Sequence, residues 1–460
     1  MPSQELREVA RELFRKALQA ADAYGATVRA LRRDGPAFLV AGRRIELGKS
    51  SRIHVVGAGK ASAPMAGAVE DVLGDLVADG VVVAKEGHSV PLRRIAVREA
   101  GHPVPDQRGL RATEEVLRVI DASSPHDVIL CLLSGGASAL LVKPVSGLPL
   151  EEKQRLTQLL LACGASIEEI NCVRKHLSAV KGGRLAQRAA PRQVISLIVS
   201  DVIGDRLDTI ASGPTAPDPT TFDEALGVIG KYGLESKLEG LSVLEVLRKG
   251  AAGKRPETPK PSEPFFRRVS NVIVASNRLA LEAAASHARE LGFRTLVLTS
   301  CLRGEAKEAG KFIASIAWEI WQSGSPVEPP ACLLFGGETT VRLGEAPGKG
   351  GRNQELALSA CLELPPSEKV VLLCAGTDGT DGPTDAAGAM VDGKTAERAR
   401  RAGLEPLAYL EAHDSYFFFE RTGELLRTGP TGTNVMDLAI LLVGGRHEAD
   451  KDCVHDRSRH

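Results

Sequence analysis

The sequence carries no excess charge of either sign. Its 460 residues include 58 lysines and arginines and 58 aspartates and glutamates. Proteins that bind nucleic acids or anionic membranes usually carry a basic excess, so this balance favours neither as a partner. No apolar run approaches the ~18 residues of a membrane-spanning helix. The charged residues 1–33 lack a signal-peptide core and predict an amphipathic helix.

Metal-binding and disulfide patterns are also missing. None of the eight cysteines forms a Cys-x-x-Cys pair, and most have apolar neighbours, as Cys131 has. Such residues are typical of reduced core cysteines, so we expect a cytoplasmic protein. The ten histidines show no metal-ligand spacing, and neither a Gly-x-Ser-x-Gly motif nor a Cys–His signature occurs. These absences disfavour zinc proteins, serine hydrolases and cysteine proteases.

What the sequence does contain is an alternation of apolar strands and helical segments. The expected strands are 53–56, 81–83, 128–133, 194–199, 272–275, 295–298, 332–334 and 370–374. The helical segments between them include 61–76, 110–120 and 278–291. Strands that are apolar throughout and alternate with helices indicate parallel sheets covered on both faces. The predicted fold class is therefore α/β, of the doubly wound Rossmann-like type.

A proline-rich stretch indicates where the domains divide. Residues 250–264 contain four prolines and no apolar periodicity. We interpret this stretch as a linker between a larger N-terminal Rossmann-like domain, residues 1–255, and a smaller C-terminal α/β domain, residues 265–447. The polar residues 448–460 are interpreted as a tail. No internal repeat of about 20–50 residues indicates a solenoid.

The first motif that suggests chemistry follows the strand 53–56. Gly57, Gly59 and Lys60 stand where this strand turns into a helix. Glycines let a backbone approach a ligand, and the N–H groups of a helix N-terminus attract anions. A dinucleotide fingerprint needs a third small residue, glycine or alanine, where Ser62 stands. Glu86 follows the next strand at the place of a ribose-binding acid, so this alternative is weakened but stays open.

Two more turns follow apolar strands in the first block. One contains Ser134, Gly135, Gly136 and Ser138. Because parallel strands end at one edge of a sheet, it is expected to form an anion-binding crevice with the first turn. The other contains Asp201 and Asp205, which we interpret as Mg²⁺ ligands. Turn-capping aspartates are the alternative.

A basic segment also lies in the first block. It includes Arg174, Lys175, His176 and Lys181. Such a cluster suits an acidic substrate, whereas an ordinary solvated helix face is the alternative.

The second block has two comparable motifs. Gly337, Glu338 and Thr339 end a strand, and Arg352 and Asn353 then open a helix. Arginine at that position suits bidentate contact with a phosphate or a carboxylate, although a surface arginine is the alternative. A loop with three carboxylates and three glycines, which includes Asp378, follows the strand 370–374. It does not fit a calcium-binding loop, and its density of such residues favours a functional role.

One stretch matches a P-loop pattern by letters alone. Residues 388–395 fit Gly-x4-Gly-Lys-Ser/Thr. A true P-loop follows a strand, whereas turn formers precede this match and its interior is itself strand-like. Asp392 would also oppose a phosphate. We therefore predict that the match is coincidental.

Taken together, the sequence resembles the class II glycerate 2-kinases, a glycerate kinase family whose C-terminal part is called MOFRL. The resemblance covers about residues 8–445. In the first block it rests on Gly57-Ala-Gly-Lys-Ala-Ser62, Leu133-Ser-Gly-Gly-Ala-Ser138, Arg174-Lys-His-Leu-Ser178 with Lys181-Gly-Gly183, and Ser200-Asp-Val-Ile-Gly-Asp205. In the second block it rests on Gly336-Gly-Glu-Thr-Thr-Val341, Gly350-Gly-Arg-Asn-Gln-Glu355, Gly376-Thr-Asp-Gly-Thr-Asp-Gly382 and Thr431-Gly-Thr-Asn-Val-Met-Asp437. Phe335 departs from the small residue expected before Gly336.

The resemblance implies an ATP-dependent kinase that phosphorylates the 2-hydroxyl of D-glycerate with Mg²⁺ or another divalent cation. It also implies two α/β domains with the active site in the cleft between them, and a homodimer is possible. Relatives named hydroxypyruvate reductase make an NAD(P)H-dependent reductase the first alternative. A non-catalytic nucleotide- or acid-binding protein is the second.

The site residues are assigned on this basis. Expected catalytic residues are Lys60, Arg352 and Asp378. Expected nucleotide- or phosphate-binding residues are Gly57, Gly59, Ser134, Gly135, Gly136, Ser138, Gly337, Glu338 and Thr339. Expected substrate-binding residues are Lys175, His176, Lys181, Asn353, Thr433 and Asn434. Asp201 and Asp205 are the expected metal ligands.

Overall fold

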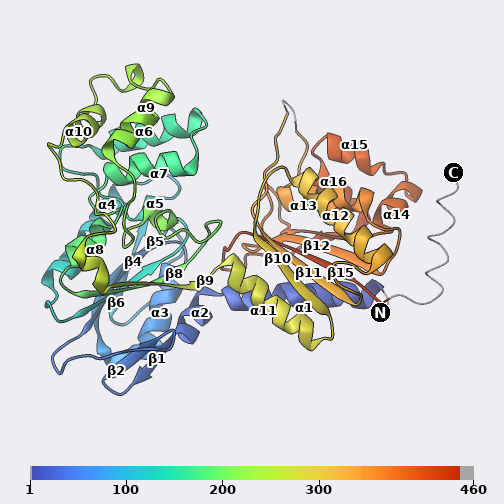
Figure 1. The fold of residues 1–460 in the computed structure, drawn as a ribbon, viewed down its shortest axis with the longest axis horizontal. Helices are drawn as coiled ribbons and strands as arrows, with labels where there is room; N and C mark the ends of the chain where they lie inside the picture. The colour runs from blue at the N-terminus through green and yellow to red at the C-terminus, as the bar shows by residue number, and fades with distance from the viewer. Residues whose placement is uncertain (1–2, 345–346, 446–460) are drawn as a thin grey trace. The chain divides into compact units, whose positions relative to one another are not determined.

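The computed structural model describes residues 3–344 and 347–445 and divides into two compact units (Figure 1). Ala23–Val274 form one, called here the N-terminal unit. The first helix and the chain from Ala275 onward form the other, the C-terminal unit. The expected tail, residues 448–460, lies outside the described residues.

The N-terminal unit is built on a six-stranded sheet. Its strand order is β6-β5-β4-β7-β8-β9. The bounds are β4 (Ile53–Ala58), β5 (Val77–Lys85), β6 (Ile95–Ala100), β7 (Val128–Leu133), β8 (Gln193–Val199) and β9 (Val269–Ala275). β4 runs parallel to both β5 and β7, and the pairs β5–β6 and β7–β8 are also parallel. The expected parallel α/β sheet is confirmed here. β7 is buried along its whole length because both faces are covered.

Helices of this unit cover the sheet and form a separate layer. Those against the strands are α3 (Ser62–Leu73), α4 (Gln107–Ala122), α5 (Ala137–Leu140) and α8 (Arg184–Ala189). The layer consists of α6 (Leu150–Ala162), α7 (Ile167–His176), α9 (Phe222–Lys231) and α10 (Ser242–Ala251). It has its own apolar core, around Leu160, Val173 and Phe222, and Figure 1 shows it beyond one end of the sheet. A capping box of Ser166 and Glu169 starts α7.

The C-terminal unit has a mixed sheet. Its strand order is β10-β11-β15-β12-β13-β14. The bounds are β10 (Arg294–Leu302), β11 (Ala331–Gly337), β12 (Val370–Gly376), β13 (Gly388–Asp392), β14 (Leu425–Leu426) and β15 (Asp437–Val443). Within the described residues of this sheet, β10 and β11 are parallel, whereas β15 inserts antiparallel between β11 and β12. The expectation of a parallel sheet was wrong for this unit, although its α/β class is confirmed.

The helices of the C-terminal unit include one from the far end of the chain. They are α1 (Ser3–Ala21), α11 (Asn277–Glu290), α12 (Ala306–Ser323), α13 (Arg352–Glu363), α14 (Thr395–Arg401), α15 (Pro406–Glu411) and α16 (Ser415–Thr422). α1 packs against α11, β12 and β15 (Figure 1). The expected N-terminal domain began at residue 1, whereas the structure assigns α1 to the other unit.

The expected helix over residues 1–33 ends early. α1 stops at Ala21, and α2 (Ala23–Ala30) leads into a small antiparallel sheet. The strands of that sheet are β1 (Leu31–Asp34), β2 (Ala37–Val40) and β3 (Arg43–Ile45). The charges of Arg32 and Arg33 made this segment look helical, but they lie on exposed positions of a strand.

The proline-rich stretch 250–264 packs within the N-terminal unit. Thr258 is buried, and the Pro259 carbonyl accepts a hydrogen bond from the Asp218 N–H at 2.9 Å. β9 follows this stretch and adds a strand to the N-terminal sheet. The division between the two units therefore falls after β9 rather than at the prolines.

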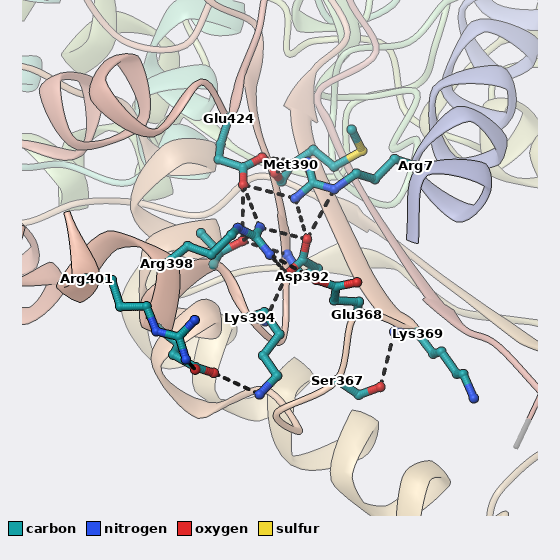
Figure 2. Close-up of polar contacts among 12 residues, drawn as sticks. Arg7, Ser367, Glu368, Lys369, Met390, Asp392, Lys394, Arg398, Arg401 and Glu424 are labelled. Atoms are coloured by element: carbon teal, nitrogen blue, oxygen red, sulfur yellow. Dashed lines mark hydrogen bonds and ion pairs between the residues drawn. The ribbon is translucent and has the colours of Figure 1, made fainter. Parts of the chain in front are cut away.

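A buried ion network ties α1 to the C-terminal sheet (Figure 2). Arg7 lies 2.7 Å from Asp392 Oδ2 and 2.5 Å from Glu424 Oε2. Arg398 pairs with the same two carboxylates from α14. The side chains of Asp392 and Glu424 are only 2% and 8% exposed. Because buried charges are costly without partners, both arginines are needed to neutralise this pair of carboxylates.

Arg7→Met is therefore expected to destabilise the C-terminal unit. The loss should be about 2 kcal/mol, below the ~3–5 kcal/mol of a wholly broken buried pair, because Arg398 still contacts both carboxylates. Urea unfolding monitored by circular dichroism measures it. Arg11→Met, which removes only the exposed pair with Glu8, is the control and should cost less than about 1 kcal/mol. Equal losses of stability in both variants would contradict the claim that the ion pairs of Arg7 stabilise the C-terminal unit.

The P-loop pattern is not a P-loop in the structure. Gly388–Asp392 form β13, which pairs antiparallel with β12. Lys394 pairs with Glu397 at 2.8 Å, and Asp392 accepts from both arginines of the network. The prediction that the match is coincidental is confirmed.

Lys394→Ala should accordingly leave turnover within a few-fold of the parent. Lys394 is the N-cap residue of α14, and its ammonium group pairs with the surface carboxylate of Glu397. Steady-state kinetics under saturating substrates provide the measurement. A fall of ~10³-fold, the size expected for a phosphate-cradling lysine, would contradict the structural argument.

Candidate functional site

The turn after β4 is shaped by close packing against the turn after β7. A Cβ atom at Gly57 would lie 2.0 Å from the Leu132 carbonyl oxygen. A Cβ atom at Gly59 would lie 2.0 Å from Ser134 Oγ. Both glycines also have positive φ, 158° and 139°. Only glycine therefore fits at these two positions, and the reason lies in the protein's own packing.

The N–H groups of this first turn already have partners. The Gly59 N–H donates to Val83 O at 3.0 Å, and the Lys60 N–H donates to Gly135 O at 2.8 Å. The Ala61 N–H donates to Ser134 Oγ at 3.0 Å. A dinucleotide-binding turn keeps such donors for the pyrophosphate. This turn therefore offers a ligand the Lys60 side chain rather than its backbone.

Three ionisable side chains border the second turn. Lys60 Cγ and the His102 ring lie 3.3 and 3.0 Å from the place of a Gly136 Cβ. Asp201 Oδ2 lies 2.3 Å from the place of a Gly135 Cβ. Burial, and then the positive charge of Lys60, lower the pKa of His102. The structure thus brings Lys60, Asp201 and the turn together, and His102 joins them although no sequence motif had marked it.

The two expected metal ligands differ in their surroundings. Asp201 stands beside the glycines of the second turn, where a phosphate-bound cation would need a carboxylate. Asp205 has φ 53°, and its N–H donates to Val202 O at 3.0 Å, as in a tight turn. No group of three or more His, Cys, Asp or Glu suited to a metal occurs within residues 3–344 and 347–445. Mg²⁺ commonly uses one or two carboxylates plus phosphates, so Asp201 fits such a role.

Two residues of the basic segment lie against carboxylates inside the protein. Lys175 Nζ lies 2.7 Å from Asp218 Oδ1, and both side chains are buried. His176 Nε2 lies 2.9 Å from Glu257 Oε1, and its Nδ1 contacts Cys172 O at 2.8 Å. Burial would raise the pKa of Asp218, but the hydrogen bond and charge of Lys175 outweigh it and lower that pKa. These pairs stabilise the fold, so a role in substrate binding stays a prediction.

Lys181 and Ser138 lie on either side of a strained segment. Lys181 Nζ donates to Ala211 O at 3.4 Å. The hydroxyl groups of Ser138 and Ser212 are 2.9 Å apart, and Ser212 Oγ donates to Asn171 Oδ1 at 2.9 Å. Ala211 and Ser212 have φ values of 55° and 61°. Such backbone is costly for residues other than glycine and concentrates at ligand sites.

In the C-terminal unit, Arg352 lies between two carboxylates. Its Nε and Nη2 donate to the carboxylate of Asp437 at 2.5 and 3.0 Å, and Nη1 donates to Glu338 at 2.7 Å. Burial opposes the charge, but the hydrogen bonds with Asp437 outweigh it and raise the pKa of Arg352. The Arg352 side chain remains 35% exposed and can still contact a ligand. Gly337 and Thr339 line a cavity of about 10 Å³ beside Asp437.

Asp381 caps the helix that carries Arg352. Its carboxylate accepts from the Asn353 N–H and side-chain amide at 3.0 and 3.1 Å, and from the Gln354 N–H at 2.8 Å. Burial is the main reason that its pKa rises to about 6, with Asp437 adding to the effect. Asn353 is thus held by Asp381. Asp378 accepts from the Thr380 N–H and hydroxyl at 3.0 and 3.1 Å and is only partly buried.

The two expected substrate residues near the C-terminus make contacts within the fold. Thr433 Oγ1 donates to Ala21 O, at the end of α1, at 2.6 Å. Asn434 Oδ1 accepts from the Met436 N–H at 3.0 Å, where the chain has a positive φ of 70°. Both residues shape the loop before β15, and their contact with a substrate stays a prediction.

Comparisons with known proteins give the family. Residues 9–248 match the domain of unknown function DUF4147, and residues 331–437 match the MOFRL family. The glycerate 2-kinase of Pyrococcus horikoshii is 44% identical over 96% of this chain and 98% of its own. The D-glycerate 2-kinase of Thermotoga maritima is 49% identical over 85% and 91%. This chain belongs to the glycerate kinase family with a C-terminal MOFRL domain.

Further comparisons agree on the fold and show how names vary in the family. The crystal structure of a glycerate kinase from Thermotoga maritima matches with a TM-score of 0.84 at 44% identity, over 96% of this chain and all of that one. A protein of Agrobacterium vitis that is 45% identical over 85% of this chain and 87% of its own is named putative hydroxypyruvate reductase. Among the described residues, no helix is both long enough and apolar enough to span a membrane.

Proposed function

We propose that this protein transfers the γ-phosphoryl group of ATP to the 2-hydroxyl of D-glycerate, giving 2-phospho-D-glycerate and ADP. Support comes from the names of the relatives and from the second turn of the N-terminal unit. The observation that carries the proposal is Lys60 beside Gly135, Gly136 and Asp201. Within residues 23–274 no carboxylate forms an ion pair with Lys60, so its charge is available to a phosphate.

The transfer requires one bond to form and one to break. The 2-hydroxyl oxygen attacks the γ-phosphorus, the bond from phosphorus to the β,γ-bridging oxygen breaks, and the hydroxyl proton leaves. Charge spreads over the transferred group in a loose transition state, so fixed cations lower the barrier. Lys60 and Arg352 are the cations that we assign to this role. Asp378, partly exposed and held by Thr380, is assigned as the base that accepts the proton.

Mg²⁺ would supply charge neutralisation on the β- and γ-phosphate oxygens. Asp201 is the residue that we assign to it, since its carboxylate stands beside the second turn. Asp205 is retained as a second ligand on the strength of the sequence motif. The seven described cysteines are free thiols, which suits a reducing compartment such as the cytoplasm. Homodimer formation stays a prediction.

The reductase alternative has less support. NAD(P)H would need the N–H groups of the first turn for its pyrophosphate, but Val83, Gly135 and Ser134 already accept from them. Ser62, which replaces the third small residue, directs its hydroxyl to Gly59 O and Val83 O at 2.8 and 3.2 Å.

A ³¹P NMR experiment with the purified protein, ATP, Mg²⁺ and D-glycerate tests the proposal. We expect ADP and a phosphomonoester whose phosphorus couples to the proton on C2, because attack by the 2-hydroxyl places the phosphate there. A parallel sample with NADH and hydroxypyruvate should show no NADH oxidation. NADH oxidation without ADP formation would overturn the proposal, and coupling to the C3 protons would overturn its regiochemistry.

A further inference from the structure

Three cationic side chains of the N-terminal unit have no carboxylate partner among residues 3–344 and 347–445. Lys153 comes from α6, Arg174 comes from the last turn of α7, and Lys181 follows α7. Lys153 is 5% exposed, and Lys181 is fully buried. Lys153 Nζ has no hydrogen-bond partner in the described part of the chain, and Lys181 Nζ has only the Ala211 carbonyl. We call these three residues the cationic pocket.

Burial lowers the pKa of all three groups, and neighbouring charges lower the pKa of the two lysines further. Burial is the main reason that the pKa of Lys153 falls to about 7, and the charge of Arg174 adds to the effect. Burial, then Lys153 and then Arg174 lower the pKa of Lys181 well below its usual value. Burial also lowers the pKa of Arg174. Both lysines are therefore desolvated and repelled by a neighbouring cation, which costs stability.

Lys175, in the same region, is a buried cation that does have carboxylate partners. Its buried ammonium group lies 2.7 Å from Asp218 and 3.7 Å from Asp208. Proteins rarely bury lysine unless it is paired in this way. Lys153 and Lys181 are both exceptions to that rule. A ligand that carries a negative charge would supply the partner that these buried cations lack, which would explain why they are there.

Neutral donors and strained backbone adjoin the pocket. Ala211, whose carbonyl accepts from Lys181, and Ser212 both have positive φ. Ser212 connects Asn171 to Ser138, which belongs to the second turn beside Lys60. The hydrogen bond of Lys181 to Ala211 and those of Ser212 to Asn171 and Ser138 therefore meet at two consecutive residues. Arg174 is only partly buried, so its side chain is accessible to solvent.

We infer that Lys153, Arg174 and Lys181 bind the carboxylate group of the acid substrate and thereby select small 2-hydroxy acids. This inference rests on the proposed function, in which the acceptor is a glycerate. Such an acceptor has one charged group, and it needs a fixed cation to hold it while the 2-hydroxyl reacts. The Arg174 guanidinium supplies a planar fork for two carboxylate oxygens, and the lysines supply point charges. Lys175 and His176, which already have carboxylate partners, are not part of this pocket.

Isothermal titration calorimetry with the whole protein tests the inference directly. D-glycerate should bind the parent, whereas glycerol, which lacks the carboxylate, should not. Lys153→Met and Arg174→Gln should each weaken D-glycerate binding at least tenfold. Arg155→Gln removes an exposed charge from the same helix and should leave binding unchanged. Equal affinity of the parent and both pocket variants for D-glycerate would overturn the inference.

Proton uptake gives a readout that a merely structural role would not produce. The charge of Arg174 acts on Lys153, and the charges of Lys153 and Arg174 act on Lys181. A bound carboxylate should raise the pKa of Lys153, so binding at pH 7.5 should take up protons. Titrations in two buffers of different ionisation enthalpy measure this uptake, and Lys153→Met should reduce it. Binding without any proton uptake would count against Lys153.

Lys153→Met should stabilise the ligand-free protein although it weakens the binding of D-glycerate. Lys153→Met removes an unpaired buried charge, so the Tm of the ligand-free protein should rise by a few degrees. D-glycerate should then raise that Tm less than it raises the Tm of the parent. A lower Tm in the ligand-free variant would overturn the claim that Lys153 is unpaired.

Titration with inorganic phosphate tests whether the cationic pocket binds a phosphate rather than the carboxylate of D-glycerate. If phosphate but not D-glycerate binds the parent and Lys153→Met abolishes this binding, the pocket takes phosphate and the carboxylate assignment is overturned.

Steady-state kinetics distinguish a failure of the pocket assignment from a failure of the proposed kinase activity. Lys153→Met should raise KM for glycerate at least tenfold and leave KM for ATP unchanged. If the parent binds D-glycerate through these residues yet forms no ADP, the pocket is upheld and the kinase proposal fails.

Discussion

Replacing Lys60 by alanine is expected to lower kcat by ~10²–10⁴-fold, which corresponds to about 3–5 kcal/mol of transition-state stabilisation. Its ammonium group has no carboxylate partner within residues 23–274, and its Cγ lies beside Gly136 at the end of the parallel strands. A cation aimed at the transferred phosphoryl group stabilises the transition state more than it stabilises bound ATP. KM for ATP should therefore change much less than kcat. Steady-state kinetics with the folded variant measure both.

Two further measurements make this prediction specific. Lys85 also acts on His102 from the end of β5, so Lys85→Ala is a matched control that should keep kcat within a few-fold. The pKa of His102 should rise in Lys60→Ala, because a nearby positive charge has been removed, and NMR titration can follow it. A parental kcat in Lys60→Ala would remove this residue from the mechanism. An unchanged His102 pKa would contradict the placement of Lys60 beside it.

Replacing Arg352 by alanine should cost both activity and stability. We expect a fall in kcat of ~10²–10⁴-fold, because a bidentate guanidinium would no longer face the phosphoryl group. Asp437 is 7% exposed and would lose its partner, so the free energy of unfolding should also fall. We expect about 2–3 kcal/mol, less than for a fully buried pair, since the guanidinium is partly exposed. Kinetics and urea unfolding report the two losses separately.

Conservative variants separate the two roles of Arg352. Arg352→Lys keeps the charge but loses the fork that holds Asp437 and Glu338 together, so it should recover stability better than activity. Asp437→Asn removes the main anchor of Arg352 but keeps the guanidinium, so kcat should fall less than in Arg352→Ala. If Arg352→Lys recovers full kcat, positive charge alone suffices and the bidentate role is wrong.

Most of the parallel sheet could be predicted from the sequence, but the central strand of the C-terminal sheet could not. Residues 128–133 are apolar throughout and stand between helical segments, which identifies a buried parallel strand. β15 is equally buried at 437–443, yet it was not predicted. Its place between β11 and β12 joins residues about one hundred positions apart, as Leu333 pairs with Leu441. Local periodicity carries no information about such a pairing.

The candidate site could likewise be predicted from the sequence only in part. The glycine-rich turns, Lys60 and Arg352 are visible as motifs because glycines and cations at strand ends have a local chemical meaning. The sequence does not show that the Gly59 and Lys60 N–H groups are already bonded, since Val83 lies on β5 and Gly135 lies in the turn after β7. It also does not show that Lys175 pairs with Asp218 while the nearby Lys181 has no carboxylate partner in the part of the chain that the structure describes.

The sequence by itself determined the α/β class, the family, the strand-end turns and the rejection of the P-loop pattern. Each of these depends on residues that are close together along the chain, where apolar periodicity and turn chemistry act locally. Tertiary structure alone decided that α1 belongs with the C-terminal unit, where Arg7 meets Asp392. It also decided which buried cations are paired and which are not. Pairing depends on the distance between side chains from different elements, and that distance exists only once the chain has folded.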